Sequence, residues 1–422
     1  MASIFVLCVD MFCLRSSAVA AAVTFISIGV LVAPAASADV FNGRIAFSSF
    51  RVDPPAGEAR TGDVFTINPA GTDLRRLTTN PADDAQADWS SDGKVIAYRI
   101  RKPNSRINFE VARMSAFGDG QRRLTDTPTG QASSQPSWFP DMSAILYRRS
   151  GPGLIASIWQ MGPLGEDSQL RYDPPGAQWY PSLSPDMSTI VFATTTSSTG
   201  DTDRAIHTIN RDGGTVQTLF DVVGAYDSAP AWSPDGALIA FQSDANVAGE
   251  NPEGDMEIWT MNADGGDPRQ LTHNALHDEG PVWSPDATML AYSSGSDDAH
   301  LDIAIMTTTG APVRTLTDYA GRDESPDWQA IPAPRTDRRC GDLAGTGAYD
   351  VRAAGHGLAC HKALALARHW SAAERAGKRP SRIQGFDVDV SDFGGTLRVV
   401  LTHRGNHHDG GNGKLLAFLY QP

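Results

Sequence analysis

The chain has 422 residues, of which 41% are hydrophobic and 20% charged, and its 40 glycines and 27 prolines favour turn-rich β structure over long helices. The formal charge of -14 is uneven: residues 39–334 carry 21 basic and 40 acidic side chains, and residues 335–422 carry 13 and 8. An acidic body repels phosphate backbones, so we expect no nucleic-acid partner, although solubility alone also explains this charge.

The first 38 residues have the pattern of a secretory signal peptide. Arg15 precedes an apolar run from Ala18 to Val32, and Ala36-Ser37-Ala38 supplies the small residues that signal peptidase requires. The run is short for a membrane span. We therefore expect cleavage before Asp39, a secreted or periplasmic mature chain, and no membrane span after cleavage.

A WD-like motif then recurs about every fifty residues, which is typical of stacked or radial repeats. Each copy has an anchor residue, a four-residue turn and an apolar strand. The copies are DWSSDGKVIAYR (88–99), SWFPDMSAILYR (137–148), SLSPDMSTIVFA (182–193), AWSPDGALIAFQ (231–242) and VWSPDATMLAYS (282–293). We expect the anchor tryptophans to pack between repeats rather than to form a ligand cage. They are Trp89, Trp138, Trp232, Trp283 and Trp328.

The turn is specified by its chemistry, as Ser233-Pro234-Asp235-Gly236 shows. Proline fixes φ at the second turn position, and the Ser and Asp side chains hydrogen-bond to the backbone of the turn. Glycine removes steric strain at the last position. Met142, Met187 and Ala287 stand where this glycine stands. We therefore predict a type I turn with no requirement for positive φ at its last position.

Two further strands complete each repeat. The third strands are VFTI (64–67), VARM (111–114), IWQM (158–161), IHTI (206–209), IWTM (258–261) and IAIM (303–306). The fourth are RRLT (75–78), RRLT (122–125), SQLR (168–171), QTLF (217–220), RQLT (269–272) and RTLT (314–317). The first repeat begins at Ile45 without an anchor strand, whereas the last anchor, Trp328, has no repeat of its own. We predict an all-β, six-bladed β-propeller over residues 39–334, in which the C-terminal strand completes the first blade.

The pattern W-S-P-D-G-x-x-I-A-F, I-W-x-M, R-x-L-T resembles the propeller repeat of TolB and its relatives, and it covers residues 44–330. The resemblance implies the propeller fold. It leaves the function open, because the family includes interaction domains, lids of peptidases and some lyases. TolB carries an α/β domain before its propeller, and we expect none here because the repeat begins next to the predicted cleavage site.

The composition changes after Pro334, and residues 335–422 predict a small α+β domain. We expect one helix over 358–376 and strands at 349–352, 386–390, 397–401 and 415–420. The pattern C-G, Y-x-V-x-A, C, A, W, G-F, G, F resembles a small cysteine-paired domain that ends many exported bacterial proteins. Cys340 and Cys360 are the two cysteines left after cleavage and predict one disulfide. Val388 and Leu401 stand where such domains carry a second cysteine pair, so we expect an apolar contact there.

Acidic residues form the main candidate binding site. Aspartates stand at one repeat position before four anchors, and two of them are followed by glutamates; the six residues are Asp84, Asp227, Asp278, Glu279, Asp323 and Glu324. Because the anchor strand of a blade is innermost, we expect these carboxylates around one mouth of the channel. They would hold a cation, or a Lys, Arg or amine of a peptide. The alternative is that each Asp caps backbone N–H groups of its own loop.

The loops between second and third strands open on the same face. Their acidic residues are Asp201, Asp203, Glu250, Glu253, Asp255, Asp297 and Asp298. This face is either a binding surface or a solvated rim.

Motifs of common enzymes are absent from the sequence: there is no G-x-S-x-G elbow, HExxH, P-loop or dinucleotide fingerprint. We place the histidine pairs His273/His277 and His403/His407 in connections between strands. We therefore expect a scaffold that binds a protein, a peptide or an envelope glycan, with no cofactor except an optional divalent cation. The alternative is a metal-assisted polysaccharide lyase or hydrolase whose carboxylate ring holds the ion. A third is an extracellular structural module.

Overall fold

The computed structural model describes residues 40–51, 61–102, 105, 107–152, 154–173, 176–195, 203–332, 338–341, 348–354, 360–378, 382–383, 386–393, 396–403 and 415–420. The predicted signal peptide lies outside these residues, and so do the side chains of Cys340 and Cys360. In the described part, no helix is both long and apolar enough to cross a membrane.

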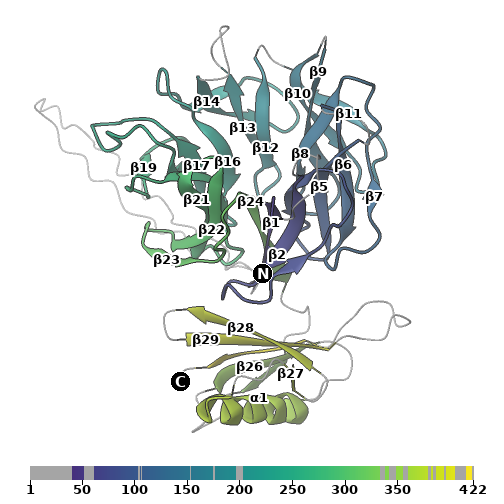
Figure 1. Cartoon of the computed structure of the whole chain (residues 1–422), viewed down its shortest axis with the longest axis vertical. Coiled ribbons are helices and arrows are strands. Elements are labelled where there is room, and N and C mark those ends of the chain that lie inside the picture. Colours follow the sequence, from purple (N-terminus) through teal and green to yellow (C-terminus); the bar gives the residue numbers. More distant parts are fainter. Residues whose placement is uncertain are drawn as a thin grey trace, which may run out of the picture. The chain divides into compact units, whose positions relative to one another are not determined.

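Six four-stranded antiparallel sheets form the blades of a propeller (Figure 1). Blade 1 consists of β24 (Asp323–Pro332), β1 (Val40–Ser49), β2 (Asp63–Ile67) and β3 (Arg75–Arg76). Blade 2 consists of β4 (Asp84–Trp89), β5 (Val95–Arg101), β6 (Phe109–Ser115) and β7 (Arg122–Arg123). Blade 3 consists of β8 (Ala132–Trp138), β9 (Ile145–Gly151), β10 (Leu154–Met161) and β11 (Gln169–Tyr172).

The second half of the ring repeats this order. Blade 4 consists of β12 (Gln178–Leu183), β13 (Thr189–Thr195), β14 (Arg204–Asn210) and β15 (Gln217–Phe220). Blade 5 consists of β16 (Ser228–Trp232), β17 (Leu238–Ser243), β18 (Glu257–Asn262) and β19 (Arg269–Gln270). Blade 6 consists of β20 (His277–Trp283), β21 (Met289–Asp297), β22 (His300–Thr307) and β23 (Pro312–Thr315).

The predicted closure of the ring is confirmed. Strand β24 pairs antiparallel with β1, with Trp328 opposite Ile45 and Asp323 opposite Ser49. The anchor strands β4, β8, β12, β16, β20 and β24 each contact the anchor strands of both neighbouring blades, so they form the innermost ring around the channel. The last strand of the propeller therefore belongs to the first blade and gives it four strands like the other five.

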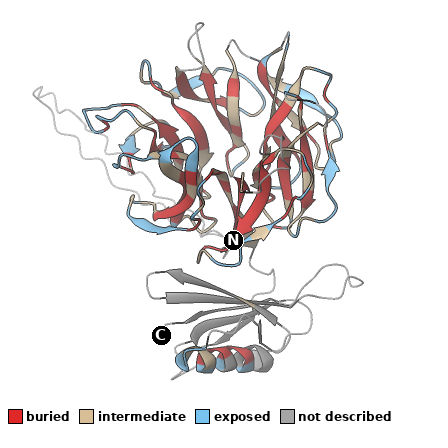
Figure 2. Ribbon diagram, in the orientation of Figure 1, coloured by how far each residue is buried: buried red, intermediate tan, exposed pale blue. Residues whose placement is uncertain are grey.

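Much of the strand surface in the propeller is buried (Figure 2), and the hydrophobic clusters join residues of neighbouring blades. Trp328 packs with Met289, Ile305 and Leu316 of blade 6, all of them buried. Trp283 packs in the same way on blade 5, and its Nε1 donates to the carbonyl of Ala231 over 3.1 Å. The anchors therefore pack between blades.

The turns after the anchors correct one prediction. The N–H of the fourth turn residue donates to the carbonyl of the first, as from Gly236 to Ser233 over 2.8 Å. The two central residues have no positive φ, which agrees with a type I turn. However, φ at the fourth position is positive even without glycine: 62° at Met142, 61° at Met187 and 58° at Ala287. The hydrogen bonds of the turn and the pairing of the strands hold these residues in a left-handed conformation.

The C-terminal region forms a separate six-stranded sheet with one helix, in agreement with the predicted α+β arrangement. Its strand order is β25 (Arg338–Gly341), β26 (Ala348–Ala354), β30 (Leu415–Tyr420), β29 (Thr396–His403), β28 (Phe386–Phe393) and β27 (Arg382–Ile383), and the helix is α1 (Cys360–Arg375). Helix α1 contacts β25 and β26 and buries Leu366, Ala367 and Trp370. Val388 and Leu401 are direct partners in the β28–β29 register.

Candidate functional site

Each inner strand of the propeller carries a β-bulge at the same repeat position. The strand pairing shifts register there, and the bulged residue has a left-handed backbone with φ between 48° and 62°. The six residues are Gln86, Gln135, Tyr180, Ala229, Gly280 and Ser325. In a non-glycine residue this conformation costs about 1 kcal/mol or more. The inner wall of the channel therefore carries the same backbone strain in five of the six blades.

Side chains of neighbouring blades satisfy the N–H groups that the bulges release. The N–H of Gln135 donates to Oε1 of Gln86 over 3.1 Å, and the N–H of Tyr180 donates to Oε1 of Gln135 over 2.9 Å. The N–H of Gly280 donates to Oε1 of Gln242 over 2.9 Å. These bonds connect adjacent blades around the channel, so the geometry of the mouth depends on the closed ring.

The four predicted aspartates of the mouth are fully buried: Asp84, Asp227, Asp278 and Asp323. Groups of the wall donate to them. Nδ2 of Asn80 lies 2.5 Å from Asp84, and Oγ of Ser243 lies 2.5 Å from Asp227. Asp227 also accepts from the N–H of Val222, in the loop before it. These carboxyl groups support the loops of the wall and have no open path to a ligand in the channel.

Burial changes the protonation of these carboxyl groups. Desolvation raises the pKa of Asp84 and the pKa of Asp227 to about 7. It also raises the pKa of Glu257, on β18, to about 7, with a further increase from the charge of Asp278. The wall therefore contains carboxyl groups that gain charge near neutral pH.

The two predicted glutamates stay partly open. The side chains of Glu279 and Glu324 are 18% and 15% exposed, and Arg322 forms ion pairs with both. Its Nη2 lies 3.1 Å from Oε1 of Glu279. Desolvation is the largest influence on both pKa values. It raises the pKa of Glu324, whereas His277 and Arg322 outweigh it at Glu279 and lower that pKa.

His277 joins this side of the mouth, which the sequence did not indicate. Its Nε2 lies 3.0 Å from Oδ1 of Asp298 and 3.5 Å from Oε2 of Glu279. Ligand atoms of these three residues all lie within 4.8 Å of one another, close enough to share a metal ion. His277 is the first residue of β20 rather than part of a connection, and it lies two residues before Glu279 on the same face of that strand. The spacing of His273 and His277 could not predict this group, because its other members are Glu279 and Asp298 rather than His273.

Arginines and aromatic rings occupy the mouth side of blades 3 to 5. The Arg148 and Arg204 guanidinium carbons lie 3.7 Å and 4.1 Å from the ring centre of Trp179. Arg204 also lies 4.3 Å from the ring centre of Tyr226 and is only 3% exposed. Burial raises the pKa of the neighbouring Tyr180 to about 12. The mouth is thus a mixture of both charges and aromatic surface rather than a purely acidic ring.

The long loops at this end of the strands add exposed acidic groups. Glu250 and Glu253 are exposed, and the side chains of Asp297 and Asp298 are 57% and 72% exposed. Asp201 lies outside the described residues.

Comparison with known proteins shows what the propeller resembles. The family model PD40, the TolB beta propeller domain, matches residues 167–333. The solved structure of TolB from Acinetobacter baumannii matches with a TM-score of 0.53 and 19% identity, over 68% of this chain and 66% of TolB. This protein contains a TolB-like β-propeller. The TolB-like propeller also matches a TolB candidate from Agrobacterium tumefaciens, with a TM-score of 0.51 and 19% identity over 70% of this chain and 100% of the other.

A relative with a sequence match extends the comparison. An uncharacterised protein of Agrobacterium fabrum is 28% identical over 173 residues, which are 39% of this chain and 57% of that relative. The match therefore spans little more than half the length of the relative. At these identities the structural matches establish the fold alone.

Proposed function

We propose that this protein is an exported scaffold that binds a protein or peptide partner at the mouth of its TolB-like propeller. The supporting observation is the pair of glutamates, Glu279 and Glu324, that Arg322 holds between neighbouring inner strands while both remain partly exposed. Preorganised charges of this kind give a binding site specificity and a fast association rate. The buried aspartates would act behind them by holding the loops in place.

Export is part of the same proposal. Its support is the signal-like N-terminal segment, the tail that resembles a domain of exported proteins, and the likeness to TolB. An envelope glycan has less support as a partner, because the groups at the mouth are mainly paired charges. A periplasmic or secreted location is checked by fractionation of cells that express the full chain, followed by N-terminal sequencing of the mature protein.

Capture of partners from envelope extract tests the binding site. We expect the double variant Glu279→Gln/Glu324→Gln to lose partners that the wild-type chain captures at low salt. The matched control is Asp119→Asn/Asp167→Asn, which removes the same charge from exposed side chains in the hairpins of blades 2 and 3, away from the mouth. Equal capture by wild type, the mouth variant and the control would contradict the assignment of the site.

A metal-assisted polysaccharide lyase or hydrolase is a second candidate, because His277, Glu279 and Asp298 bring their ligand atoms together. Its test is titration with Mn²⁺ and Zn²⁺, followed by assays on a panel of acidic polysaccharides. Stoichiometric binding that His277→Ala abolishes, together with turnover, supports this candidate. A wild-type chain that binds neither ion removes its basis.

A further inference from the structure

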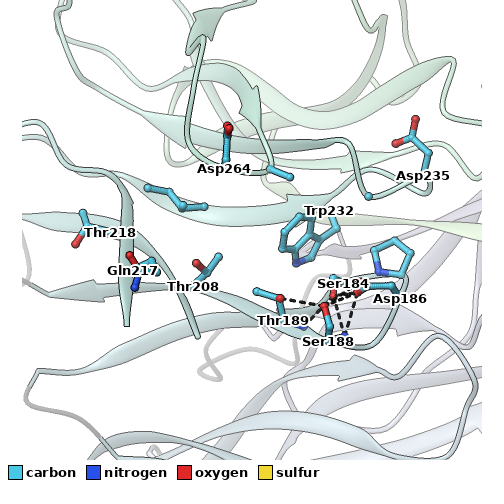
Figure 3. A pocket seen from close by; sticks show the side chains of 14 residues that line it. Ser184, Asp186, Ser188, Thr189, Thr208, Gln217, Thr218, Trp232, Asp235 and Asp264 are labelled. Atoms are coloured by element: carbon cyan, nitrogen blue, oxygen red, sulfur yellow. Dashed lines mark hydrogen bonds between the residues drawn. The ribbon is translucent and has the colours of Figure 1, made fainter. Parts of the chain in front are cut away.

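A groove of about 530 Å³ opens between blades 4 and 5, away from the mouth. It lies where the inner strands end in their turns, and its walls are the 184–189 segment, β14 and β15 on one side and the 235–236 turn with the β18–β19 hairpin on the other. Figure 3 shows the Trp232 ring at its centre, between Asp264 and the turn that contains Asp186. The groove is thus independent of the glutamate pair in the proposed function.

Trp232 differs from the other anchors. Trp89, Trp138, Trp283 and Trp328 are between 4% and 8% exposed, whereas Trp232 is half-buried. The preceding blade explains the difference. At the repeat position of Thr189, blades 2, 5 and 6 have Val95, Leu238 and Met289, each of which packs in the same cluster as the following anchor. The smaller, polar Thr189 leaves part of the Trp232 side chain exposed to the groove.

Arginines that bridge blades elsewhere are missing from this interface. Arg314 of blade 6 donates through Nη1 to the carbonyl of Ala70, in the next blade's hairpin, over 2.6 Å. Arg113 of blade 2 donates to the carbonyl of Pro163, in the hairpin of blade 3, over 2.8 Å. The corresponding residues of blade 4 are Gln217 and Thr208, which are too short to span the gap. All the other blades except blade 3 have arginine at the position of Gln217: Arg75, Arg122, Arg269 and Arg314.

Carboxylates surround the space where an arginine would lie. Asp186 stands on the wall from blade 4, Asp235 and Asp264 stand on the wall from blade 5, and all three are exposed. Asp264 occupies the hairpin position that Ala70 has in blade 1. No lysine or arginine lines the groove among the residues that the structure describes. A partly exposed indole with negative groups around it attracts an organic cation.

We propose that this groove binds the guanidinium of an arginine side chain from a basic peptide. The guanidinium would stack on Trp232 and take the place that Arg314 occupies between blades 6 and 1. A planar guanidinium fits this role better than an ammonium, because it stacks on the ring while donating to carboxylates and carbonyls at its edge.

The test is calorimetric titration of the full chain with a tetra-arginine peptide, with a tetra-glutamate peptide and a neutral oligosaccharide as comparison ligands. We expect binding of tetra-arginine alone. Gln217→Arg should fill the groove with the chain's own guanidinium and weaken that binding by about tenfold or more. Asp264→Ala, which restores the residue of blade 1, should weaken it several-fold.

Three controls separate the groove from other sites. Gln169→Arg adds the same charge to an exposed position on blade 3 and should leave the affinity for tetra-arginine unchanged. An unchanged thermal midpoint shows that Gln217→Arg is folded. Glu279→Gln/Glu324→Gln reports binding at the mouth. The proposal is wrong if wild type does not bind tetra-arginine, if the neutral oligosaccharide binds instead, or if the mouth variant loses the peptide while Gln217→Arg retains it.

Discussion

At the residue scale, buried carboxyl groups make the stability of the propeller depend on pH. Asp84 and Asp227 have a pKa of about 7 in the folded chain, against a reference value of 3.8. Between pH 4 and 7 the folded state therefore keeps protons that the unfolded chain has released. Their contribution to stability is complete below pH 4 and is lost as the pH rises through 7.

We expect Asp84→Asn to reduce the loss of stability between pH 5 and pH 8. Each buried carboxyl group accounts for up to about 2.5 kcal/mol of that loss, because its pKa of about 7 lies about two pH units above pH 5. The measurement is urea unfolding of wild type and variant at both pH values. Asp212→Asn is the control, because its side chain is 78% exposed. A wild-type chain and an Asp84→Asn chain with the same pH dependence would show that Asp84 is ionised throughout.

At the turn positions with positive φ, a substitution can be destabilising for two reasons: the conformation of the backbone and the steric contacts of the new Cβ. A Cβ on Gly236 would meet only Pro185, at 3.6 Å, whereas a Cβ on Gly93 would lie 2.2 Å from the carbonyl oxygen of Ala330. We expect Gly236→Ala to cost about 1 kcal/mol and Gly93→Ala about 3 kcal/mol or more. Ala287→Gly should stabilise the chain by about 0.5 kcal/mol, since it removes the conformational penalty. Thermal and urea unfolding measure all three; equal costs for the two glycine variants would contradict the contact to Ala330.

At the scale of the strand, the bulges and their hydrogen bonds decide how the inner ring is built. A bulge exposes an N–H group that the sheet can no longer bind, and in this propeller a glutamine of the preceding blade supplies the acceptor. The glutamine side chains of the ring thus replace some of the backbone hydrogen bonds that the bulges remove from the sheets.

We expect Gln135→Ala to destabilise the propeller by about 1–3 kcal/mol, because it leaves the N–H of Tyr180 without its acceptor. Gln169→Ala, on the exposed outer strand of blade 3, should change stability by less than about 0.5 kcal/mol. Urea unfolding compares the two. Hydrogen exchange at the amide of Tyr180 provides a local readout, and unchanged protection in Gln135→Ala would contradict the bond.

At the scale of the whole molecule, the propeller is closed by two strands that lie far apart in the sequence, β1 and β24. Trp328 is buried among residues of blade 6, while its backbone pairs with β1 of blade 1. Stability of the ring therefore depends on both ends of the propeller segment at once.

We expect a chain ending at Pro332 to remain a folded propeller and a chain ending at Arg322 to lose cooperative unfolding. The second truncation removes β24, which exposes the inner edge of blade 1 and the pocket of Trp328. Circular dichroism and tryptophan fluorescence during thermal unfolding distinguish the two. Similar midpoints would show that blade 1 is stable without its inner strand.

The sequence alone determined the architecture, because a repeated pattern of anchors, turns and alternating strands is local information. Six copies and the displaced Trp328 were sufficient to predict the number of blades and the strand that closes the ring. The helix and the main strands of the C-terminal sheet followed from apolar patterns in the same way.

Only the tertiary structure decided what the singled-out side chains do. Asp84 and Asp227 share a repeat position at the mouth, but packing between strands buries them, and sequence spacing carries no information on depth. Met142 and Ala287 adopt positive φ because strand pairing on both sides of the turn outweighs their intrinsic preference. The exposure of Trp232 likewise results from the sizes of Thr189 and Gln217 on the adjacent blade, which the pattern of its own blade does not contain.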